Sequence, residues 1–210
     1  MPPKPKFTRE EVVQAALDIV SARGMEALTA RELGTALGSS ARPLFTVFKN
    51  MEELHQATRA AAMARFEGFM PDGLEDAPAF KQAGMRMVLF AMQEPKLYQL
   101  LFMEEDTTAA SFDDMLIRLG PTAQDCIDAI CADYGLDACQ ARLLFENMWI
   151  YTFGIGALCA MRVCSFSRQQ LGQMLTTAFQ GAMMLIKSGN YLPDNGGQQE
   201  RRGHDEREAL

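Results

Sequence analysis

The sequence predicts an all-α protein, and three observations support this prediction. Apolar residues recur at three- and four-residue spacings along most of the chain, as they do on one face of a helix. Capping residues precede these stretches, and glycine or proline stands near their ends. No stretch alternates apolar and polar residues for long enough to require a sheet. With 210 residues, 48% of them hydrophobic, the chain is long enough to bury a core in one or two domains.

Two helices near the N-terminus are defined by the residues that start them. Thr8 and Glu11 have the spacing of a capping box, in which each side chain accepts a hydrogen bond from the other residue's backbone. The helix that follows is expected to end at Gly24. Thr29 and Glu32 have the same spacing and begin a second helix. The sequence therefore predicts two consecutive helices before residue 38.

The segment after the second helix is predicted to be a tight turn and a third, short helix. Gly38 ends the second helix, because glycine tolerates the positive φ that such an end requires. Ser39 and Ser40 offer a new N-cap. Pro43 then falls in the first helical turn, where its missing N–H costs little. Two short helices joined in this way are typical of a helix-turn-helix motif, although an ordinary pair of core helices has the same pattern.

The third helix is expected to have an inward and an outward side. Leu44 and Phe48 are four residues apart and should anchor the helix to the core. The residues left to face elsewhere are Ala41, Arg42, Phe45, Thr46 and Val47. In a helix-turn-helix motif the second helix enters the DNA major groove, and its N-terminal residues contact base edges. The outward residues are therefore candidates for DNA contact.

Four consecutive blocks make the pattern more specific. They read VVQAALDIVSARG, LTARELGTALG, a recognition-helix block ending in LFTVFKN, and MEEL. In this order and without insertions, they resemble the DNA-binding domain of the tetracycline-repressor (TetR) family of bacterial transcription regulators. The resemblance implies a three-helix helix-turn-helix domain in residues 1–51 and a helical ligand-binding and dimerisation domain in residues 52–189. The polar residues 190–210 are predicted to be a disordered tail.

The resemblance also indicates which residues meet DNA. Arg42 stands at the front of the recognition helix, and arginine bound to guanine is the commonest specific contact. Arg31 occupies a position where family members often contact DNA, and Lys49, just past the helix, is expected to meet a phosphate. The full expected DNA-binding set is Arg31, Ser39, Ser40, Ala41, Arg42, Pro43, Phe45, Thr46 and Lys49. For the three hydroxyl residues of this set, capping and helix filling are equally good explanations.

Three positions depart from the family pattern. The family usually has Tyr at the position of Phe45, often His or Tyr at that of Val47, and Lys at that of Met51. These family residues commonly touch phosphates. A ligand-binding or protein-interaction module of the same fold, with weak or no DNA binding, is therefore the alternative to a regulator.

Charge is distributed unevenly along the chain, whose formal net charge is −7. Residues 1–51 contain seven Lys or Arg and five Asp or Glu, a balance of +2, which leaves −9 for the remainder. A basic reader joined to an acidic body is the distribution expected of a DNA-binding regulator. Lys4 and Lys6 could follow a phosphate backbone, and a solvated terminus is an equally good explanation for them.

The rest of the chain is predicted to be a series of helices. A long helix from about 52 to 69 should link the two domains, and the loop at 70–78 is the clearest break between them. The helices predicted after this loop cover residues 79–92, 95 onward, 112–119, 122–134, 137–163 and 167–188. No internal repeat is evident.

Methionine and aromatic residues are concentrated in these body helices. Methionine fills irregular gaps and lines adaptable binding surfaces, so each such residue taken singly is best explained as core. As a group they favour a cavity, because the resemblance implies a ligand pocket among these helices. The expected lining residues are Met85, Phe90, Phe102, Met103, Met115, Phe145, Met148 and Trp149. Such a lining favours a small apolar or aromatic ligand.

The segment WIYTFGIGALCAM, residues 149–161, is apolar on nearly every side. A helix of this kind must be buried all round, and one small body covers only one of its sides. Gly154 and Gly156 would permit the close approach of a partner. The sequence thus predicts a homodimer held by this helix and the helix of residues 171–186, as the resemblance also implies.

The available residues disfavour catalysis. The chain has two His and contains no H-E-x-x-H, phosphate-binding Gly loop or paired C-x-x-C, so we expect no enzyme, no metal and no cofactor. Five Cys, an odd number, suit a reducing cytoplasm. Cys159 and Cys164 are best explained as buried apolar residues, with a thiol redox sensor as the alternative. A ligand-processing enzyme is the remaining rival.

No segment resembles a membrane anchor or a signal peptide. The longest uncharged stretch, residues 147–161, is too short to span a bilayer. The sequence therefore predicts a cytoplasmic transcription regulator that binds double-stranded operator DNA as a dimer. We expect it to be a repressor that a small ligand releases, which requires the ligand to bind the two states unequally.

Overall fold

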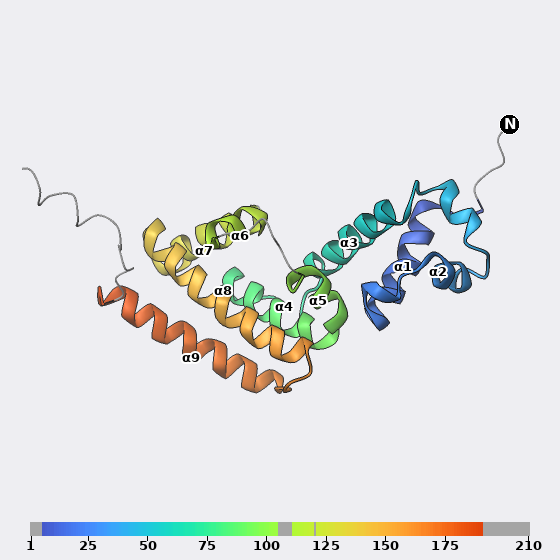
Figure 1. The fold of residues 1–210 in the computed structure, drawn as a ribbon. Helices are drawn as coiled ribbons and strands as arrows, with labels where there is room; N and C mark the ends of the chain where they lie inside the picture. The colour runs from blue at the N-terminus through green and yellow to red at the C-terminus, as the bar shows by residue number, and fades with distance from the viewer. Residues whose placement is uncertain (1–5, 105–110, 120, 191–210) are drawn as a thin grey trace, which may run out of the picture.

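A computed structural model describes residues 6–104, 111–119 and 121–190, and the regular structure in these residues is entirely helical, as the sequence predicts. The helices are α1 (Arg9–Arg23), α2 (Ala30–Ala36), α3 (Met51–Glu67), α4 (Ala79–Gln93), α5 (Pro95–Phe102), α6 (Phe112–Leu119), α7 (Pro121–Tyr134), α8 (Ala138–Ala160) and α9 (Arg168–Lys187), with two short 3₁₀ helices, η1 (Met25–Ala27) and η2 (Arg42–Thr46). Figure 1 shows α1 and α2 at one end of the molecule and α9 at the other. The predicted tail, apart from residue 190, lies outside the described residues.

The first two helices begin where their caps predict. The Glu11 N–H donates to Thr8 Oγ1 at 3.1 Å, and the Thr8 N–H donates to Glu11 Oε2 at 2.8 Å, which completes a capping box. Thr29 caps α2 by accepting from the Glu32 N–H at 3.2 Å. The box expected here is only half formed, because the Glu32 carboxylate pairs with Arg23 at 2.7 Å.

The turn between α2 and η2 differs from the expectation in one respect. Gly38 has a φ of +61°, as expected of the residue that ends α2. The N-cap of η2 is Ala41, so the prediction that Ser39 or Ser40 would cap it is wrong. η2 is a 3₁₀ helix, and its first turn is closed by the backbone, with the Leu44 N–H donating to the Ala41 carbonyl at 3.2 Å.

α3 connects the N-terminal helices to the body. Its N-cap, Asn50, accepts from the Glu53 N–H at 2.9 Å. α3 packs against α1 and against α5, and α5 in turn packs against α1 (Figure 1). The two parts of the chain therefore share a packed junction. The division into residues 1–51 and 52–189 stays a prediction, because α3 contributes to both parts.

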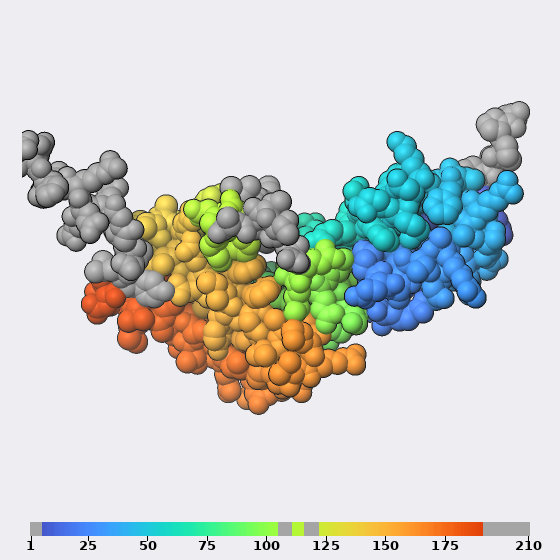
Figure 2. Space-filling view, viewed as in Figure 1, coloured from blue at the N-terminus to red at the C-terminus, as the bar shows by residue number. Residues whose placement is uncertain are grey.

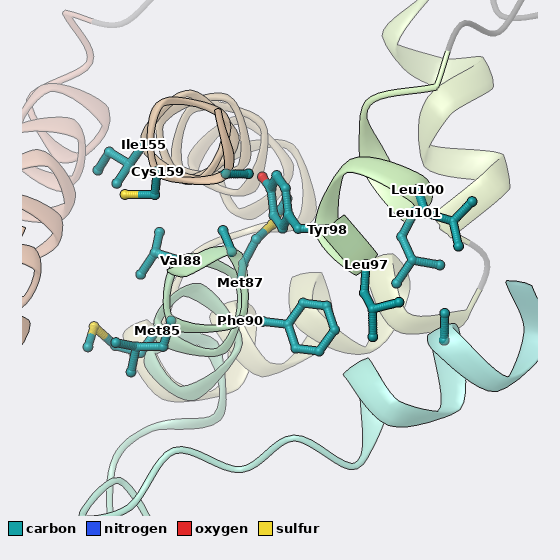
Figure 3. Close-up of a cluster of buried hydrophobic side chains, with 14 of the residues drawn as sticks. Met85, Met87, Val88, Phe90, Leu97, Tyr98, Leu100, Leu101, Ile155 and Cys159 are labelled. Atoms are coloured by element: carbon teal, nitrogen blue, oxygen red, sulfur yellow. The ribbon is translucent and has the colours of Figure 1, made fainter. Parts of the chain in front are cut away.

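The body is built around α8, which packs against α4, α5, α7 and α9. Figure 3 shows the centre of its core, where side chains from α4, α5 and α8 meet. Tyr98 of α5 is 0% exposed, and its ring is directed at α8, with the hydroxyl donating to the Phe153 carbonyl at 3.4 Å. Burial raises the pKa of Tyr98 well above its ordinary value. This tyrosine therefore stays neutral and fills the space between the two helices.

The two glycines of α8 lie on different sides of the helix. A Cβ atom on Gly156 would lie 2.3 Å from Tyr98 Oη, so Gly156 faces the protomer's own core. The prediction that Gly156 lies at a dimer interface is therefore wrong. Gly154 is exposed, and a Cβ placed there would meet nothing within 4 Å. A sequence apolar on every side does not show which glycine faces inward, since only packing decides it.

α8 is also the one helix among the described residues that is long and apolar enough to cross a membrane. Residues 147–161, which alone are too short to span a bilayer, thus belong to a longer helix that meets the criterion for a membrane-spanning helix by its length and composition alone. Its inner face packs into the protein: Leu144, Phe145, Met148 and Ile155 are buried. A core helix of a soluble protein has the same character.

Candidate DNA-binding surface and ligand cavity

The recognition segment η2 is anchored as its spacing predicts. Leu44 and Phe48 are buried, and Arg42, Phe45 and Thr46 are exposed. Phe45 is 46% exposed, which is unusual for so large an apolar side chain at the tip of a domain. η2 is therefore anchored by two buried side chains and exposes an arginine, a threonine and an aromatic ring on its outer side.

The other expected DNA-binding residues surround this segment. Arg31, Ser40 and Lys49 are exposed, while Ser39, Ala41 and Pro43 are half-buried. Two of the three hydroxyls have hydrogen-bond partners within the protein. Ser39 Oγ accepts from Lys6 Nζ at 3.1 Å, and Thr46 Oγ1 donates to the Pro43 carbonyl at 2.6 Å.

A close approach at Gly34 positions η2 against α2. A Cβ on Gly34 would lie 3.0 to 3.1 Å from backbone atoms of Ser39, Ser40 and Ala41. Only glycine lets the turn lie this close to the helix without moving the backbone. Sequence reasoning missed this contact, because a glycine within a helix pattern has several possible explanations.

Basic residues near η2 fall into two groups. Arg9 and Arg23 are paired with acids, Glu53 at 2.8 Å and Glu32 at 2.7 Å. Arg31, Arg42 and Lys49 form no ion pair with an acid among the described residues, although the charge of Lys49 interacts with that of Glu53. Arg31 and Arg42 therefore carry charge that no described acid neutralises.

Arg9 ties the end of the recognition segment to α1 and α3. Its Nη1 donates to the Val47 carbonyl at 3.2 Å and to Glu53, and its guanidinium lies 4.1 Å from the centre of the Phe48 ring. The Lys49 N–H donates to Glu53 Oε2 at 2.8 Å, and this bond and Arg9 hold the pKa of Glu53 below its ordinary value. The backbone after η2 is therefore held from two helices.

A cavity of about 330 Å³ lies in the body between α4, α7, α8 and α9. Its lining residues are Phe66, Phe80, Lys81, Ala83, Gly84, Met85, Met87, Phe102, Thr122, Ala123, Cys126, Tyr134, Phe145, Met148, Trp149, Thr152, Gly172, Leu175, Thr176, Phe179 and Gln180. Most of this lining is apolar or aromatic. Ligand sites begin at about this size and have this composition.

Five of the eight predicted pocket residues line this cavity: Met85, Phe102, Phe145, Met148 and Trp149. The other three, Phe90, Met103 and Met115, are not among its described lining residues. Phe90 is fully buried, with its ring centre 5.2 Å from that of Phe66 and 5.5 Å from that of Phe69. It packs between α4 and α3, so it belongs to the core between the cavity and the junction. Met103 follows α5, and Met115 lies on α6.

Several lining residues were missed by sequence reasoning. Phe80, Tyr134 and Phe179 form an aromatic wall, with ring centres 6.4 Å apart for Phe80 and Phe179 and 4.9 Å apart for Tyr134 and Phe179. These residues come from α4, α7 and α9. Only the tertiary arrangement brings their rings together, although their aromatic character was a usable signal.

All five cysteines are free thiols. Burial raises the pKa of Cys159, and Cys164 raises it further. Burial likewise raises the pKa of Cys126, with Asp125 adding to the shift and Arg86 opposing it. A raised pKa lowers the thiolate fraction, so these residues fit apolar packing better than redox sensing.

The outer face of the α8–α9 pair is apolar and exposed. Along α8 and its end, Ile150, Leu158 and Met161 recur on the side that also carries Gly154, and Met184 on α9 is 71% exposed. In Figure 2 the two helices form the lower left surface of the molecule, and no other described element covers them in this view. Exposed apolar faces of this kind mark association surfaces.

The junction between the two ends contains a partly buried carboxylate. Glu94, between α4 and α5, is 14% exposed at its side chain; it accepts from Ser21 Oγ of α1 at 2.6 Å and pairs with Arg65 of α3. The neighbour of Arg65 in sequence is Phe66, which lines the cavity. A short chain of contacts therefore runs from the cavity wall to α1.

These features define an all-α protein with a helix-turn-helix end, a hollow helical body and an exposed pair of long helices. No protein-family model matches the sequence, and no curated protein gives a match. Among solved structures, a variant of TetR from Acinetobacter baumannii AYE in complex with minocycline is 20% identical, with a TM-score of 0.50 over 88% of this chain and 97% of that chain. A TetR-family transcriptional regulator from Streptomyces coelicolor is 20% identical, with a TM-score of 0.47 over 90% and 98%. The fold of this chain is that of TetR-family regulators.

Proposed function

We propose that the protein is a sequence-specific transcriptional regulator: a cytoplasmic homodimer that binds a palindromic operator and is released from it by a small apolar or aromatic ligand. One observation supports this proposal above all. The exposed segment η2 carries the unpaired cation Arg42 and is held rigidly at its base by Leu44, Phe48 and Arg9. A rigid element with an outward arginine is what major-groove recognition requires.

DNA contact is proposed for the set Arg31, Ser39, Ser40, Ala41, Arg42, Pro43, Phe45, Thr46 and Lys49. Arg42 would read a base, and the exposed Phe45 ring suits the methyl group of thymine. Lys49 and Arg31 would hold phosphates, which fixes the register of the protein on the duplex.

Ligand release would act through the contacts that join the cavity to the N-terminal helices. Phe66 and Phe102 lie on the cavity wall, with ring centres 5.0 Å apart, and both helices that carry them pack at the junction. A ligand that displaces Phe66 would shift α3 and with it the Arg65–Glu94–Ser21 contacts. The two recognition segments of a dimer would then lose the spacing that the operator demands.

The experiment that tests this function is selection of bound duplexes from a random DNA pool. We expect enrichment of a palindrome with half-sites about one helical turn apart, or a multiple of it. Absence of any enriched sequence would favour the interaction module. Coupling between the two sites is then tested with the neutral fluorophore anilinonaphthalene, titrated with and without the selected DNA. Linkage requires that bound DNA lower the affinity for the ligand by the same factor as bound ligand lowers the affinity for DNA.

The dimer is tested by Leu158→Glu. Leu158 lies on the exposed α8 face, so a carboxylate there would be buried without a partner when two copies meet, at a cost of several kcal/mol. We expect a folded monomer at concentrations where the wild type is a dimer, measured by sedimentation with circular dichroism as the check on folding. Met70→Glu is the control, since Met70 is an exposed methionine in the loop after α3. A dimer that survives Leu158→Glu would contradict this interface.

A further inference from the structure

One cation lies on the wall of the cavity. Lys81 is the one Lys, Arg, Asp or Glu among the cavity's described lining residues, and it is exposed at the rim. It stands in the first turn of α4, which contains no acidic residue. The helix dipole disfavours a cation at this position, and no acid among the described residues pairs with it. The charge of Lys81 is therefore uncompensated.

Two features next to the cavity also favour negative charge. Arg86 lies five residues further along α4, outside the lining, and its charge opposes the rise in pKa of Cys126, a lining residue. Arg86 Nε is buried and has no hydrogen-bond partner among the described residues. Thr122 lies in the first turn of α7, so the positive end of that helix dipole faces the cavity wall. Asp125, whose charge acts on Cys126 in the opposite sense to that of Arg86, is exposed.

The depth of the cavity offers no comparable charge. The Thr152 hydroxyl donates to the Trp149 carbonyl at 3.0 Å, so this buried hydroxyl is already satisfied. The ring of Trp149 stacks on that of Phe153, at 5.2 Å and an interplanar angle of 10°. The described interior lining is therefore mainly aromatic and uncharged, while Lys81 places a positive charge at the exposed edge of the cavity.

We propose that the cavity takes an aromatic monoanion, with its rings among the aromatic side chains and its anionic group at Lys81. The inference rests on the proposed ligand-binding function and narrows it, because a purely apolar ligand would leave the cation unused. A cation at the rim would also discriminate against amines, since bringing a positive ligand beside Lys81 costs Coulomb energy.

A matched pair of probes tests the charge. Anilinonaphthalene sulfonate and neutral anilinonaphthalene share the same rings and differ in the sulfonate. Fluorescence titration of wild type and Lys81→Met should show about a two- to fivefold loss of affinity for the sulfonate, in the range of an exposed ion pair. Affinity for the neutral probe should stay the same. Lys81→Arg should retain sulfonate binding, and added salt should weaken it in the wild type.

Two controls separate the proposal of an anionic ligand from the proposal that the cavity binds a ligand at all. Lys187→Met removes a lysine of α9 that is not on the cavity wall and should change neither affinity. The neutral probe must displace the sulfonate competitively at one site per chain. Equal losses for both probes in Lys81→Met, or no loss for either, would overturn the charge proposal while the cavity remains a ligand site. Failure of both probes to bind would overturn the ligand-binding function as well, and the DNA selection would still stand as a separate test.

Discussion

Gly156→Ala is expected to destabilise the folded protomer by about 3 kcal/mol or more. The added Cβ would lie 2.3 Å from Tyr98 Oη and 2.6 Å from its Cζ. Tyr98 of α5 is fully buried, and its hydroxyl lies against α8 (Figure 3). Either α5 and α8 must separate or the tyrosine must leave its place, and both lose packing of the body's core. Urea denaturation measures the change.

The control is the other glycine of α8. Gly154→Ala adds the same atom where nothing lies within 4 Å, so it should be neutral or stabilising by up to about 1 kcal/mol through helix propensity. Adding Tyr98→Phe to Gly156→Ala removes the nearest clashing atom and should restore part of the loss. Both comparisons need several protein concentrations, because dimerisation contributes to apparent stability. Equal stability of the two glycine variants would contradict the inward position of Gly156.

Arg42→Ala should weaken operator binding by about 1–3 kcal/mol per recognition segment, with the loss concentrated at one base pair of each half-site. Arg42 is exposed, lies in the first turn of η2, and has no acidic partner among the described residues. Its charge and its five donors are thus free for a base. Binding measured over a salt series, with one base pair varied at a time, checks the assignment.

Lys49→Ala is the matched control for base reading. Lys49 lies past Phe48, where the backbone leaves η2, and its N–H is held by Glu53. Its loss should weaken all sequences alike and lower the salt slope by roughly one unit per lysine. Val47 and Met51 cannot donate to phosphates, so the wild-type slope should itself be modest. An equal loss on every sequence for Arg42→Ala would show that it is one more backbone contact.

The N-terminal helices were largely predictable from the sequence, because their signals are local. Thr8 and Glu11 form the expected capping box, Gly38 has the expected positive φ, and Leu44 and Phe48 are buried as their spacing predicts. Each of these features depends on residues within one or two helical turns. Ser39 and Ser40 failed as caps because a 3₁₀ turn closed by its own backbone competes with them.

The cavity was predictable in character and only partly in detail. Met85, Phe145 and Met148 line it as expected, while Phe90 faces the junction with α3 instead. Both kinds of residue are apolar and occur in helical stripes, so composition does not separate a cavity wall from a filled core. The role of Lys81 could not be predicted from the sequence either, because only the tertiary structure shows that this lysine lies beside the cavity.

The sequence by itself determined most of the helices, several of their caps and the all-α class, since a period of 3.6 residues and a cap are properties of short segments. Only the tertiary structure decided which side of each helix is covered. α8 is apolar on all sides, so its sequence pattern does not show which side is buried. The close approach of Tyr98 shows that Gly156 faces the core, and Gly154 faces outward. Gly34 likewise became a positioning residue only once the turn lay 3.0 Å from it. The physical reason is that packing brings together residues far apart in the chain, and no local pattern encodes such contacts.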